Sequence, residues 1–290
     1  ALCKSIMKLL PKTAKIKFGK ILVNGVDITD YTEKNMSRLR GELFSMVFQD
    51  PMTSLNPTIT VGKQIGEAVR IHNKKMSRGQ IRKRVIELMQ LVEIDRPEER
   101  IRQYPHEFSG GMRQRAVMAI ALAGNPKILF ADEPTTALDV TIQAQILDVF
   151  RRIQKKLEMA TVFISHDLGV VAGVADRVAV MYAGKIVEIG TAEEIFYDPR
   201  HPYTWGLLQS LPVLSEGKEW LPTLPGMPPT LIHPPKGDAF AERNVYAMRI
   251  DYEKEPPMFR ITDTHYAATW LLDERAPKVK VPTGERRDGK

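Results

Sequence analysis

The chain has 290 residues, of which 43% are hydrophobic and 27% are charged, so it can bury a substantial core and form one large domain or a domain with an appendage. No apolar run in it approaches the roughly 20 residues that cross a bilayer, so none of its segments is expected to span a membrane. A single cysteine, Cys3, excludes an internal disulfide and is typical of a reducing compartment. We interpret the net charge of +7 as solvated surface, because the charges are scattered, and expect no nucleic-acid partner.

The first residues carry a helical pattern that Pro11 ends. Its apolar positions, which a helix would place on one face, are Leu2, Ile6, Leu9 and Leu10. The chain begins with alanine instead of methionine, within this pattern. We therefore expect that the sequence begins inside a helix and that an upstream segment is missing.

Strands and helices are predicted along most of the remaining chain. The predicted strands are Ile16–Phe18, Ile21–Val23, Val26–Ile28, Leu43–Phe48, Ile128–Ala131, Thr161–Ser165, Val178–Met181 and Lys185–Ile189. Helical spacing covers Val61–Leu91, Met112–Ala123 and Thr141–Leu157. Two nearly continuous apolar strands flank the last of these helices, which predicts a βαβ unit of a parallel sheet. Prolines crowd residues 212–235 and indicate an extended linker into a small C-terminal appendage.

Two adjacent carboxylates, Asp132 and Glu133, follow the apolar strand Ile128–Ala131. Open α/β sheets place their ligands at this carboxyl end of their strands. In a nucleotide hydrolase, the first carboxylate can hold Mg²⁺ through water, and the second can orient and deprotonate the attacking water. Alone, the pattern is more typical of a strand that ends before a turn, here at Pro134.

Two other strand ends carry candidate residues. His166 follows Thr161–Ser165, beside the carboxylates, and can contact a γ-phosphate; the alternative is a surface histidine. Gln49 follows Leu43–Phe48 and can coordinate Mg²⁺ and respond to the state of the nucleotide, although a glutamine by itself is uninformative.

Ser109, Gly110, Gly111 and Met112 open a predicted helix. Glycines at the positive end of a helix let backbone amides approach an anion. An ordinary N-cap by Ser109 is the alternative, but it does not explain paired glycines, which destabilise a helix.

Together these residues stand in the order Gln49, Ser109-Gly110-Gly111-Met112, Asp132-Glu133, Ala137-Leu138-Asp139 and His166. Their order and spacing over residues 43–190 resemble the ABC ATPase family, with its Q-loop, signature, Walker B segment with catalytic glutamate, D-loop and switch histidine. The resemblance implies an α/β fold of the P-loop NTPase class. It consists of an ABC ATPase core with a mostly parallel sheet, an antiparallel β subdomain, a helical subdomain and a small C-terminal appendage.

The resemblance divides the chain into four expected parts. Residues 1–60 are a partial ATPase core with the antiparallel β subdomain, and 61–115 are the helical subdomain with the signature. Residues 116–195 are the core with Walker B and the switch histidine, and 196–290 are the proline-rich linker and a C-terminal region of the peptide-transporter type.

Longer stretches are similar to the peptide-transporter branch of the family. They are Tyr104–Gln114, Ala131–Thr141 and His201-Pro202-Tyr203-Thr204. Met112, where most signatures have glutamine, resembles the D-type subunit of oligopeptide importers, and the tail from Asp238 to about Val281 resembles D-type subunits of Gram-positive bacteria.

Two departures from the family pattern stand out. The phosphate loop G-x-x-x-x-G-K-[ST] is absent, and by similarity Ala1 falls directly after it, so we expect this chain to bind ATP poorly in its own site. Some relatives have a cysteine cluster after the Pro-Lys-Gly turn. No cysteine follows Gly237 here, so no iron–sulfur cluster is expected.

By resemblance, Glu133 is the general base, Asp132 and Gln49 bind Mg²⁺, and His166 contacts the γ-phosphate of ATP. Ser109, Gly110, Gly111 and Met112 face the ATP of a second ABC ATPase subunit, expected to form a heterodimer, and Asp139 couples the two sites. The other implied partners are two transmembrane permease subunits, contacted near Gln49 and the helices of residues 61–100, and, indirectly, an extracellular peptide-binding protein. The implied location is the cytoplasmic face of the membrane, and the implied function is ATP-driven import of oligopeptides or dipeptides.

Other readings of the same motifs are a non-catalytic or regulatory module that only completes a partner's ATP site, a DNA-repair or chromosome-organising ATPase, and a translation-factor ATPase. The DNA-repair class has a long coiled coil where only 59 residues separate Gln49 from Ser109. Translation factors normally carry two cassettes, whereas this chain has one signature.

Overall fold

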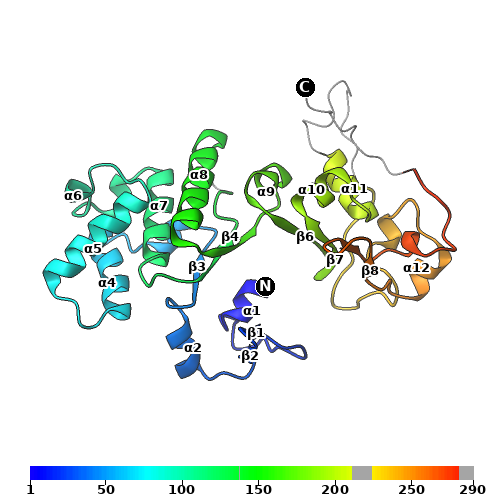
Figure 1. Ribbon diagram of the computed structural model, residues 1–290, viewed down its shortest axis with the longest axis horizontal. Helices are drawn as coiled ribbons and strands as arrows, with labels where there is room; N and C mark the ends of the chain where they lie inside the picture. Colours follow the sequence, from blue (N-terminus) through cyan, green and yellow to red (C-terminus); the bar gives the residue numbers. More distant parts are fainter. Residues whose placement is uncertain (137, 211–223, 281–290) are drawn as a thin grey trace. The chain divides into compact units, whose positions relative to one another are not determined.

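In the computed structural model, which describes residues 1–136, 138–210 and 224–280, a parallel sheet lies at the centre of the first of two units, Ala1–His166. Its order is β3 (Phe44–Val47), β4 (Ile128–Asp132) and β5 (Ala160–Ile164). The α8 helix (Val140–Leu157) connects β4 to β5, whose register runs from Ile128↔Ala160 to Asp132↔Ile164 (Figure 1). The predicted βαβ unit is therefore confirmed.

The α8 helix packs through one apolar face. Its buried residues are Ile146, Leu147, Val149, Phe150 and Ile153. This spacing of three and four places them on one side of the helix. The ring of Phe150 meets that of Phe163 on β5 edge to face, with centroids 5.8 Å apart. The same core cluster contains Leu129 and Ala131 of β4, so burial of this face holds the β4 strand in place beside α8.

After the short α3 (Pro51–Ser54), the segment between β3 and β4 contains α4 (Val61–His72), α5 (Arg78–Leu91), α6 (Pro97–Arg100) and α7 (Gly110–Ala121) (Figure 1). A short 3₁₀ turn, η1 (Pro105–Glu107), precedes α7. The sequence pattern predicted one helical stretch over Val61–Leu91, but the structure has two helices there. The reason is that Asn73 caps α4, and Ser77 forms a capping box with Gln80 at the start of α5.

The N-terminal part contains α1 (Leu2–Ile6), β1 (Leu22–Val23), β2 (Val26–Asp27), α2 (Glu33–Leu39) and, after β3, α3 (Pro51–Ser54). β1 and β2 form the predicted hairpin, and Asn24 and Gly25 have φ of 50° and 79°, as a type I′ turn requires. Ile16–Phe18 is not a strand, so that prediction is wrong: it alternates with exposed lysines and pairs with no strand among the described residues.

The buried face of α1 also differs from the prediction. Cys3 and Met7 are the buried residues, while Leu2 is 54% exposed and Leu9 37%. Cys3 and Met7 belong to a cluster with Met36, Phe44 and Phe130. Side chains four residues apart share a helical face, so burying this pair turns Leu2 outward.

The second unit, Asp167–Lys290, is built on an antiparallel sheet with the order β6-β7-β9-β8. The strands are β6 (Arg177–Tyr182), β7 (Lys185–Thr191), β8 (Phe259–Arg260) and β9 (Tyr266–Ala267). The predicted β6–β7 hairpin is confirmed, with φ of 49° and 81° at Ala183 and Gly184.

Helices of this unit are α9 (Leu168–Val174), α10 (Ala192–Tyr197), α11 (Pro202–Gln209) and α12 (Arg249–Glu253), with the 3₁₀ turns η3 (Ala241–Arg243) and η4 (Trp270–Leu272). The predicted proline-rich linker falls partly outside the described residues; its described part, residues 224–235, contains neither helix nor strand.

A buried acid joins distant segments of the second unit. Glu188 on β7 is 0% exposed and its carboxylate accepts hydrogen bonds from the backbone amides of Arg200 (2.6 Å) and His201 (3.1 Å). Its Oε1 also lies 2.8 Å from Nε2 of His265, which is equally buried. This carboxylate therefore holds the segment before β9 against the start of α11.

The structure divides the chain into two compact units, between His166 and Asp167. This division does not test the four parts expected from the sequence, which stay a prediction. No helix among the described residues is long and apolar enough to cross a membrane.

Candidate functional site

Glu133 directly follows β4 and has a left-handed backbone, with φ of 48°. Such a conformation is uncommon for a residue with a side chain and persists only where the surroundings impose it. Here the Glu133 N–H donates to the carbonyl oxygen of Ile164 at 3.0 Å, which extends the β4–β5 ladder beyond the strand end. The sheet itself thus presents the Glu133 side chain at its carboxyl edge.

Three side chains converge on one oxygen of Glu133. Gln49 donates its Nε2–H to Glu133 Oε2 at 3.0 Å, and Thr136 donates its hydroxyl to the same oxygen at 3.0 Å. Nδ1 of His166 lies 3.4 Å from that oxygen. The Glu133 side chain is 27% exposed and that of His166 68%, so the cluster is reachable from solvent. The predicted residues Gln49, Glu133 and His166 do meet, and Thr136 joins them.

Asp132 is the last residue of β4 and pairs in register with Ile164. The described residues contain no group of three or more His, Cys, Asp or Glu side chains that could hold a metal ion on its own. Mg²⁺ needs no such group, because it is usually held by one or two protein oxygens together with substrate phosphates and water. One carboxylate at Asp132 and one amide oxygen at Gln49 fit that pattern.

The signature residues lie at the start of α7. Ser109 is its N-cap, with the side-chain oxygen accepting from the Met112 amide at 3.3 Å. A Cβ on Gly111 would lie 2.6 Å from Cγ2 of Ile142 on α8, so close helix packing requires this glycine. A Cβ on Gly110 would meet Leu138 at 3.5 Å, an ordinary contact. Packing therefore explains Gly111 but not Gly110, which is exposed.

Asp139 caps α8 by accepting a hydrogen bond from the Ile142 amide at 2.9 Å. Met112 is half-buried and packs against the main core. Of the motif around Asp139, Ala137 lies outside the described residues. No hydrogen bond or ion pair within the described chain joins the signature or Asp139 to the Glu133 cluster. The structure thus contains two separate groups of candidate residues.

Sequence reasoning missed two residues of this region. Thr136 is one, since a threonine in a turn carries no signal. Gln114 on α7 is the other: it is 0% exposed, and neither atom of its side-chain amide has a hydrogen-bond partner. A buried polar side chain normally has a partner, so Gln114 stands out from the apolar residues of α7 around it.

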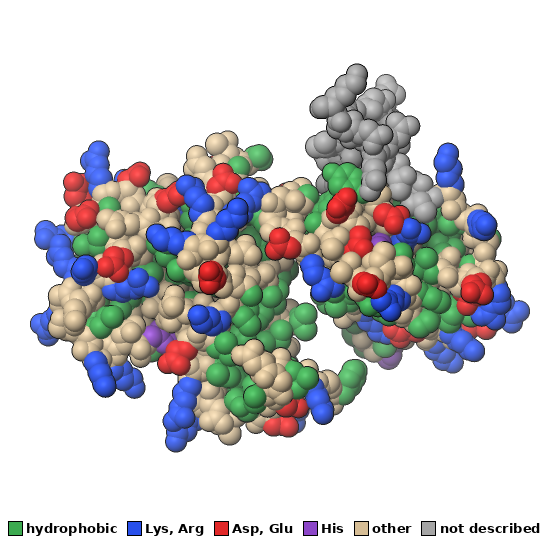
Figure 2. Space-filling model, viewed as in Figure 1, with side chains coloured by type: hydrophobic (Ala, Val, Ile, Leu, Met, Phe, Trp, Pro, Cys, Tyr) green, Lys and Arg blue, Asp and Glu red, His purple; other side chains and the backbone are tan. Residues whose placement is uncertain are grey.

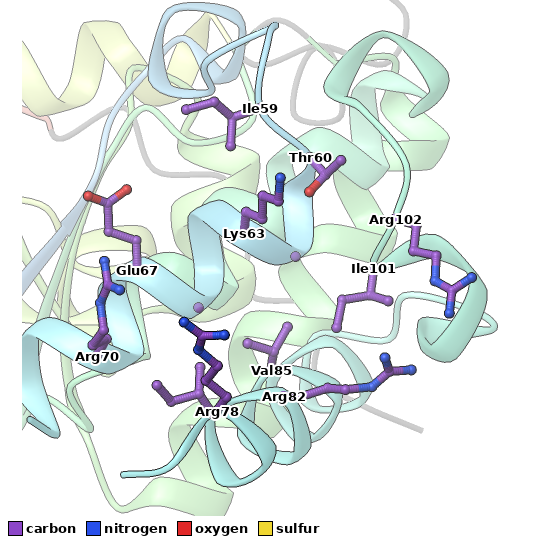
Figure 3. Close-up of a pocket in the computed structure, with 13 residues that line it drawn as sticks. Ile59, Thr60, Lys63, Glu67, Arg70, Arg78, Arg82, Val85, Ile101 and Arg102 are labelled. Carbon is purple, nitrogen blue, oxygen red and sulfur yellow. The ribbon is translucent and has the colours of Figure 1, made fainter. Parts of the chain in front are cut away.

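A cavity of about 660 Å³ opens between α4, α5 and the segment after α6. Its apolar lining comes from Ile59, Ile81, Val85 and Ile101, and its charged side chains are Lys63, Glu67, Arg70, Arg78, Arg82 and Arg102 (Figure 3). None of these six side chains makes an ion pair or hydrogen bond among the described residues. Five positively charged side chains and one negatively charged side chain thus surround an apolar surface and form no ion pairs with one another.

Gly62 brings the segment after α6 against α4. The amides of Val61 and Gly62 donate to the carbonyls of Gln103 (2.9 Å) and Ile101 (3.2 Å). A Cβ on Gly62 would collide with the Ile101 backbone and side chain, so only glycine allows this approach. One wall of the cavity is therefore fixed by backbone contacts.

Comparisons with known proteins identify two family matches, one in each half of the chain. Residues 2–136 match the ABC transporter family, and residues 187–250 match the family described as oligopeptide/dipeptide transporter, C-terminal region. The chain is 61% identical over 281 residues to an oligopeptide transport ATP-binding protein of Bacillus subtilis, covering 96% of this chain and 78% of the relative. It is 58% identical to a dipeptide transport ATP-binding protein of Lactococcus lactis, covering 95% of this chain and 79% of the relative.

Solved structures agree on the fold. A subunit of an ABC transporter complex of Clostridium perfringens superposes with a TM-score of 0.59 at 29% identity, covering 67% of this chain and 73% of that one. An ATP-binding cassette solved as a dimer with ADP and phosphate gives a TM-score of 0.57 at 24% identity, covering 66% and 79%. The expected ABC ATPase fold is therefore confirmed.

Proposed function

Because this chain belongs to the ABC transporter family, among the ATP-binding proteins of oligopeptide and dipeptide transport, we propose that it is the ATP-binding and hydrolysing subunit of an importer for oligopeptides or dipeptides. The observation that carries the proposal is the convergence of Gln49, Thr136 and His166 on Glu133 Oε2. A carboxylate held this way at the carboxyl edge of a parallel sheet is positioned for work on a bound nucleotide.

In the proposed reaction, Glu133 orients a water molecule and accepts its proton. The water oxygen bonds to the γ-phosphorus of ATP while the bond to the β–γ bridging oxygen breaks, giving ADP and phosphate. His166, beside Glu133, contacts the γ-phosphate and stabilises the charge that develops there. Thr136 and Gln49 limit the orientations that the Glu133 carboxylate can adopt.

Asp132 and Gln49 are the residues that would hold Mg²⁺. The ion supplies charge neutralisation for the phosphate oxygens of the substrate. The Gln49 side-chain N–H donates a hydrogen bond to Glu133, so its carbonyl oxygen is the atom left for the ion.

The signature group acts on the ATP of a second ATPase subunit in this proposal. Ser109 and the exposed Gly110 present backbone amides at the positive end of α7, which suits a phosphate. Gly111 allows the close packing of α7 against α8, Met112 packs against the core, and Asp139 at the start of α8 is proposed to couple the two sites. A heterodimer of ATPase subunits fits this division of roles.

The cavity between α4 and α5 is the proposed contact with two transmembrane permease subunits. Its apolar lining and its five unneutralised cations suit a short amphipathic segment that carries acidic residues. Binding there would place the chain on the cytoplasmic face of the membrane. Peptides would reach the permease from an extracellular binding protein, which this chain would not contact.

The test is phosphate release by the assembled transporter that contains this chain. Glu133→Gln should lower turnover by about a hundredfold or more, because the general base is lost. Glu98→Gln removes an exposed carboxylate of α6 and serves as the matched control. Unchanged turnover in Glu133→Gln would contradict hydrolysis at this site.

The same experiment separates the alternative, a non-catalytic module that only completes a partner's ATP site. Ser109→Arg would then stop turnover while Glu133→Gln would not. The three contacts of Glu133 favour hydrolysis, since a module that only lends its signature has no use for them.

A further inference from the structure

The signature helix α7 meets α8 close to the start of both helices. A Cβ on Gly111 would lie 2.6 Å from Cγ2 of Ile142, so the two helices approach closely there. This point lies next to the features that face a partner subunit in the proposed function, the signature at the start of α7 and Asp139 at the start of α8. Apolar packing specifies the crossing angle of two helices only as a tendency, so a second contact further along can set it.

The turn after α5 makes that second contact with α7. Arg115, about one helical turn beyond Gly111, donates from its Nη1 to the carbonyl oxygens of Val92 (3.1 Å) and Glu93 (2.9 Å). The same nitrogen lies 3.3 Å from Oε2 of Glu93, and the Arg115 side chain is only 13% exposed. The backbone of this turn therefore holds α7.

The Glu93 carboxylate extends the contact to α8. Nη1 of Arg152 lies 2.6 Å from Oε1 of Glu93, and its Nη2 donates to Oε2 at 3.0 Å. Figure 2 shows both acidic and basic side chains at the surface over α8, and ion pairs at a surface usually contribute little to stability. A bidentate pair that shares its carboxylate with a second arginine is an exception, because it fixes geometry as well as charge. Arg152 lies roughly three turns beyond Ile142, so this bridge acts on the angle of α8.

The backbone of Glu93 is left-handed, with φ of 59°. Glycine adopts this conformation without steric cost, whereas a residue with a side chain keeps it only where its surroundings impose it. In the described part of the chain, the Glu93 carboxylate contacts Arg115 and Arg152. These two contacts are therefore what a glycine at this position would lack.

We propose that Glu93 is a positioning residue: its carboxylate fixes the angle between α7 and α8, and thereby the direction in which Ser109 and Gly110 face the ATP of a partner subunit. Glu93 acts through Arg115 and Arg152 and does not itself contact the nucleotide. This assignment rests on the proposed role of the signature, but the bridge can be measured without nucleotide or partner.

Replacing Glu93 by glycine separates positioning from stability. Glu93→Gly removes the carboxylate but also relieves the left-handed backbone, so the midpoint of thermal unfolding should stay within about 3 °C. The kcat of the assembled transporter should fall by about fivefold or more, with KM for ATP within about twofold, because the signature is misaligned while the partner's own ATP contacts are untouched. A fall in kcat matched by a large fall in the unfolding midpoint would assign Glu93 to stability instead.

Arg152→Gln breaks the same bridge from the other side. It should lower kcat as Glu93→Gly does, and the combined variant should be no slower than either alone, because both changes remove one contact. The matched controls are Arg84→Gln and Glu87→Gln, whose pair at 3.3 Å lies within α5; Glu87 is 45% exposed and Glu93 36%. Both controls should keep kcat within about twofold. Equal loss in the controls, normal kcat in Glu93→Gly, or additive effects of the two bridge variants would overturn the proposal.

Spin labels measure the bridge directly. Lys83 on α5 and Lys155 on α8 are exposed, so Lys83→Cys and Lys155→Cys can be labelled in a full chain that also carries Cys3→Ala. The label on α5 reports on α7, because the two carbonyl contacts of the turn remain in Glu93→Gly. The distribution of distances between the labels should broaden in Glu93→Gly. An unchanged distribution overturns the positioning role, whereas the proposed function fails separately, if Glu133→Gln keeps normal turnover.

Discussion

The side-chain N–H of Gln49 donates a hydrogen bond to Oε2 of Glu133 at 3.0 Å, although Glu133 lies 84 positions further along the chain. The contact exists because β3 and β4 are parallel neighbours whose carboxyl ends meet at one edge. Thr136 binds that oxygen from the following turn.

Replacing Thr136 by valine tests whether this turn positions the carboxylate. Thr136→Val keeps the shape of the side chain but removes the hydroxyl that donates to Glu133. We expect kcat of the assembled transporter to fall by about tenfold with KM for ATP unchanged, because Thr136 acts through Glu133 rather than on ATP. Thr141→Val, an exposed threonine in the first turn of α8, is the control. A raised KM with normal kcat would place Thr136 in nucleotide binding instead.

Substitutions of the two signature glycines should have different effects, one on stability and the other on activity. Gly111→Ala places a Cβ 2.6 Å from Ile142, so urea unfolding should show a loss of about 1–3 kcal/mol. Ile142→Ala in the same chain makes room and should recover part of that loss. Gly110→Ala should leave stability within about 0.5 kcal/mol, because its contact is ordinary, but should lower turnover. Equal destabilisation by both substitutions would refute the distinction.

The buried pair of Glu188 and His265 should control the stability of the second unit. Glu188→Ala should destabilise it by about 3–5 kcal/mol, since it leaves buried His265 and two backbone amides without their acceptor. His265→Leu should cost less, about 1–3 kcal/mol, because Glu188 keeps the two amides. The double variant should lose less than the sum. Hydrogen exchange at β7 and β9 measures the effect. Glu255→Ala, which breaks the exposed pair with Lys185, should change stability by at most about 1 kcal/mol.

Two buried groups of the second unit should give opposing pH dependences. Burial lowers the pKa of His201 to about 3, so the unfolded chain gains a proton that the folded chain does not, and this contribution to stability falls as pH drops from about 6.5 to 3. Burial also raises the pKa of Asp238 to about 6. The folded state then takes up the proton first, and that contribution rises as pH falls from about 6 to 4.

Asp238→Asn removes the second contribution. As pH falls from about 6 to 4, its free energy of unfolding relative to that of the unmodified chain should decrease by up to about 1.4 kcal/mol for each pH unit. Urea unfolding at several pH values, followed by circular dichroism, measures the difference. Asp176→Asn is the control. A difference that does not depend on pH would mean that Asp238 does not titrate in this range.

Charge reversal in the cavity tests the proposed permease contact. Arg78→Glu together with Arg82→Glu should reduce co-purification with the permease subunits by at least about tenfold, because the expected ligand is acidic. Arg96→Glu with Arg151→Glu changes charge equally outside the cavity. Normal co-purification of the cavity variant would contradict the assignment.

The sequence predicted those parts of the fold whose signals are local. Asn24-Gly25 specifies a hairpin turn by its backbone preferences, and continuous apolar runs specify β4 and β5. The meeting of Gln49, Glu133 and His166 followed from a general property of parallel sheets, so part of the candidate site was predictable as well.

Other features depend on contacts that no local pattern records. The break between α4 and α5 is marked only by a capping pair, Ser77 and Gln80, within a charged stretch. β8 and β9 have two residues each; β9 forms on the edge of β7, and β8 pairs with β9. The need for glycine at position 111 arises from Ile142 on another helix.

The contacts of Glu133 differ in what anchors them. Gln49, Thr136 and His166 all follow strands of one sheet, β3, β4 and β5, but the segment of Gln49 also leads through α3 into the helices that line the cavity. A movement of α4 and α5 relative to the sheet would therefore act on the Gln49 contact before the other two. A change at the cavity would therefore reach the Glu133 carboxylate through one hydrogen bond, the one from the Gln49 side chain.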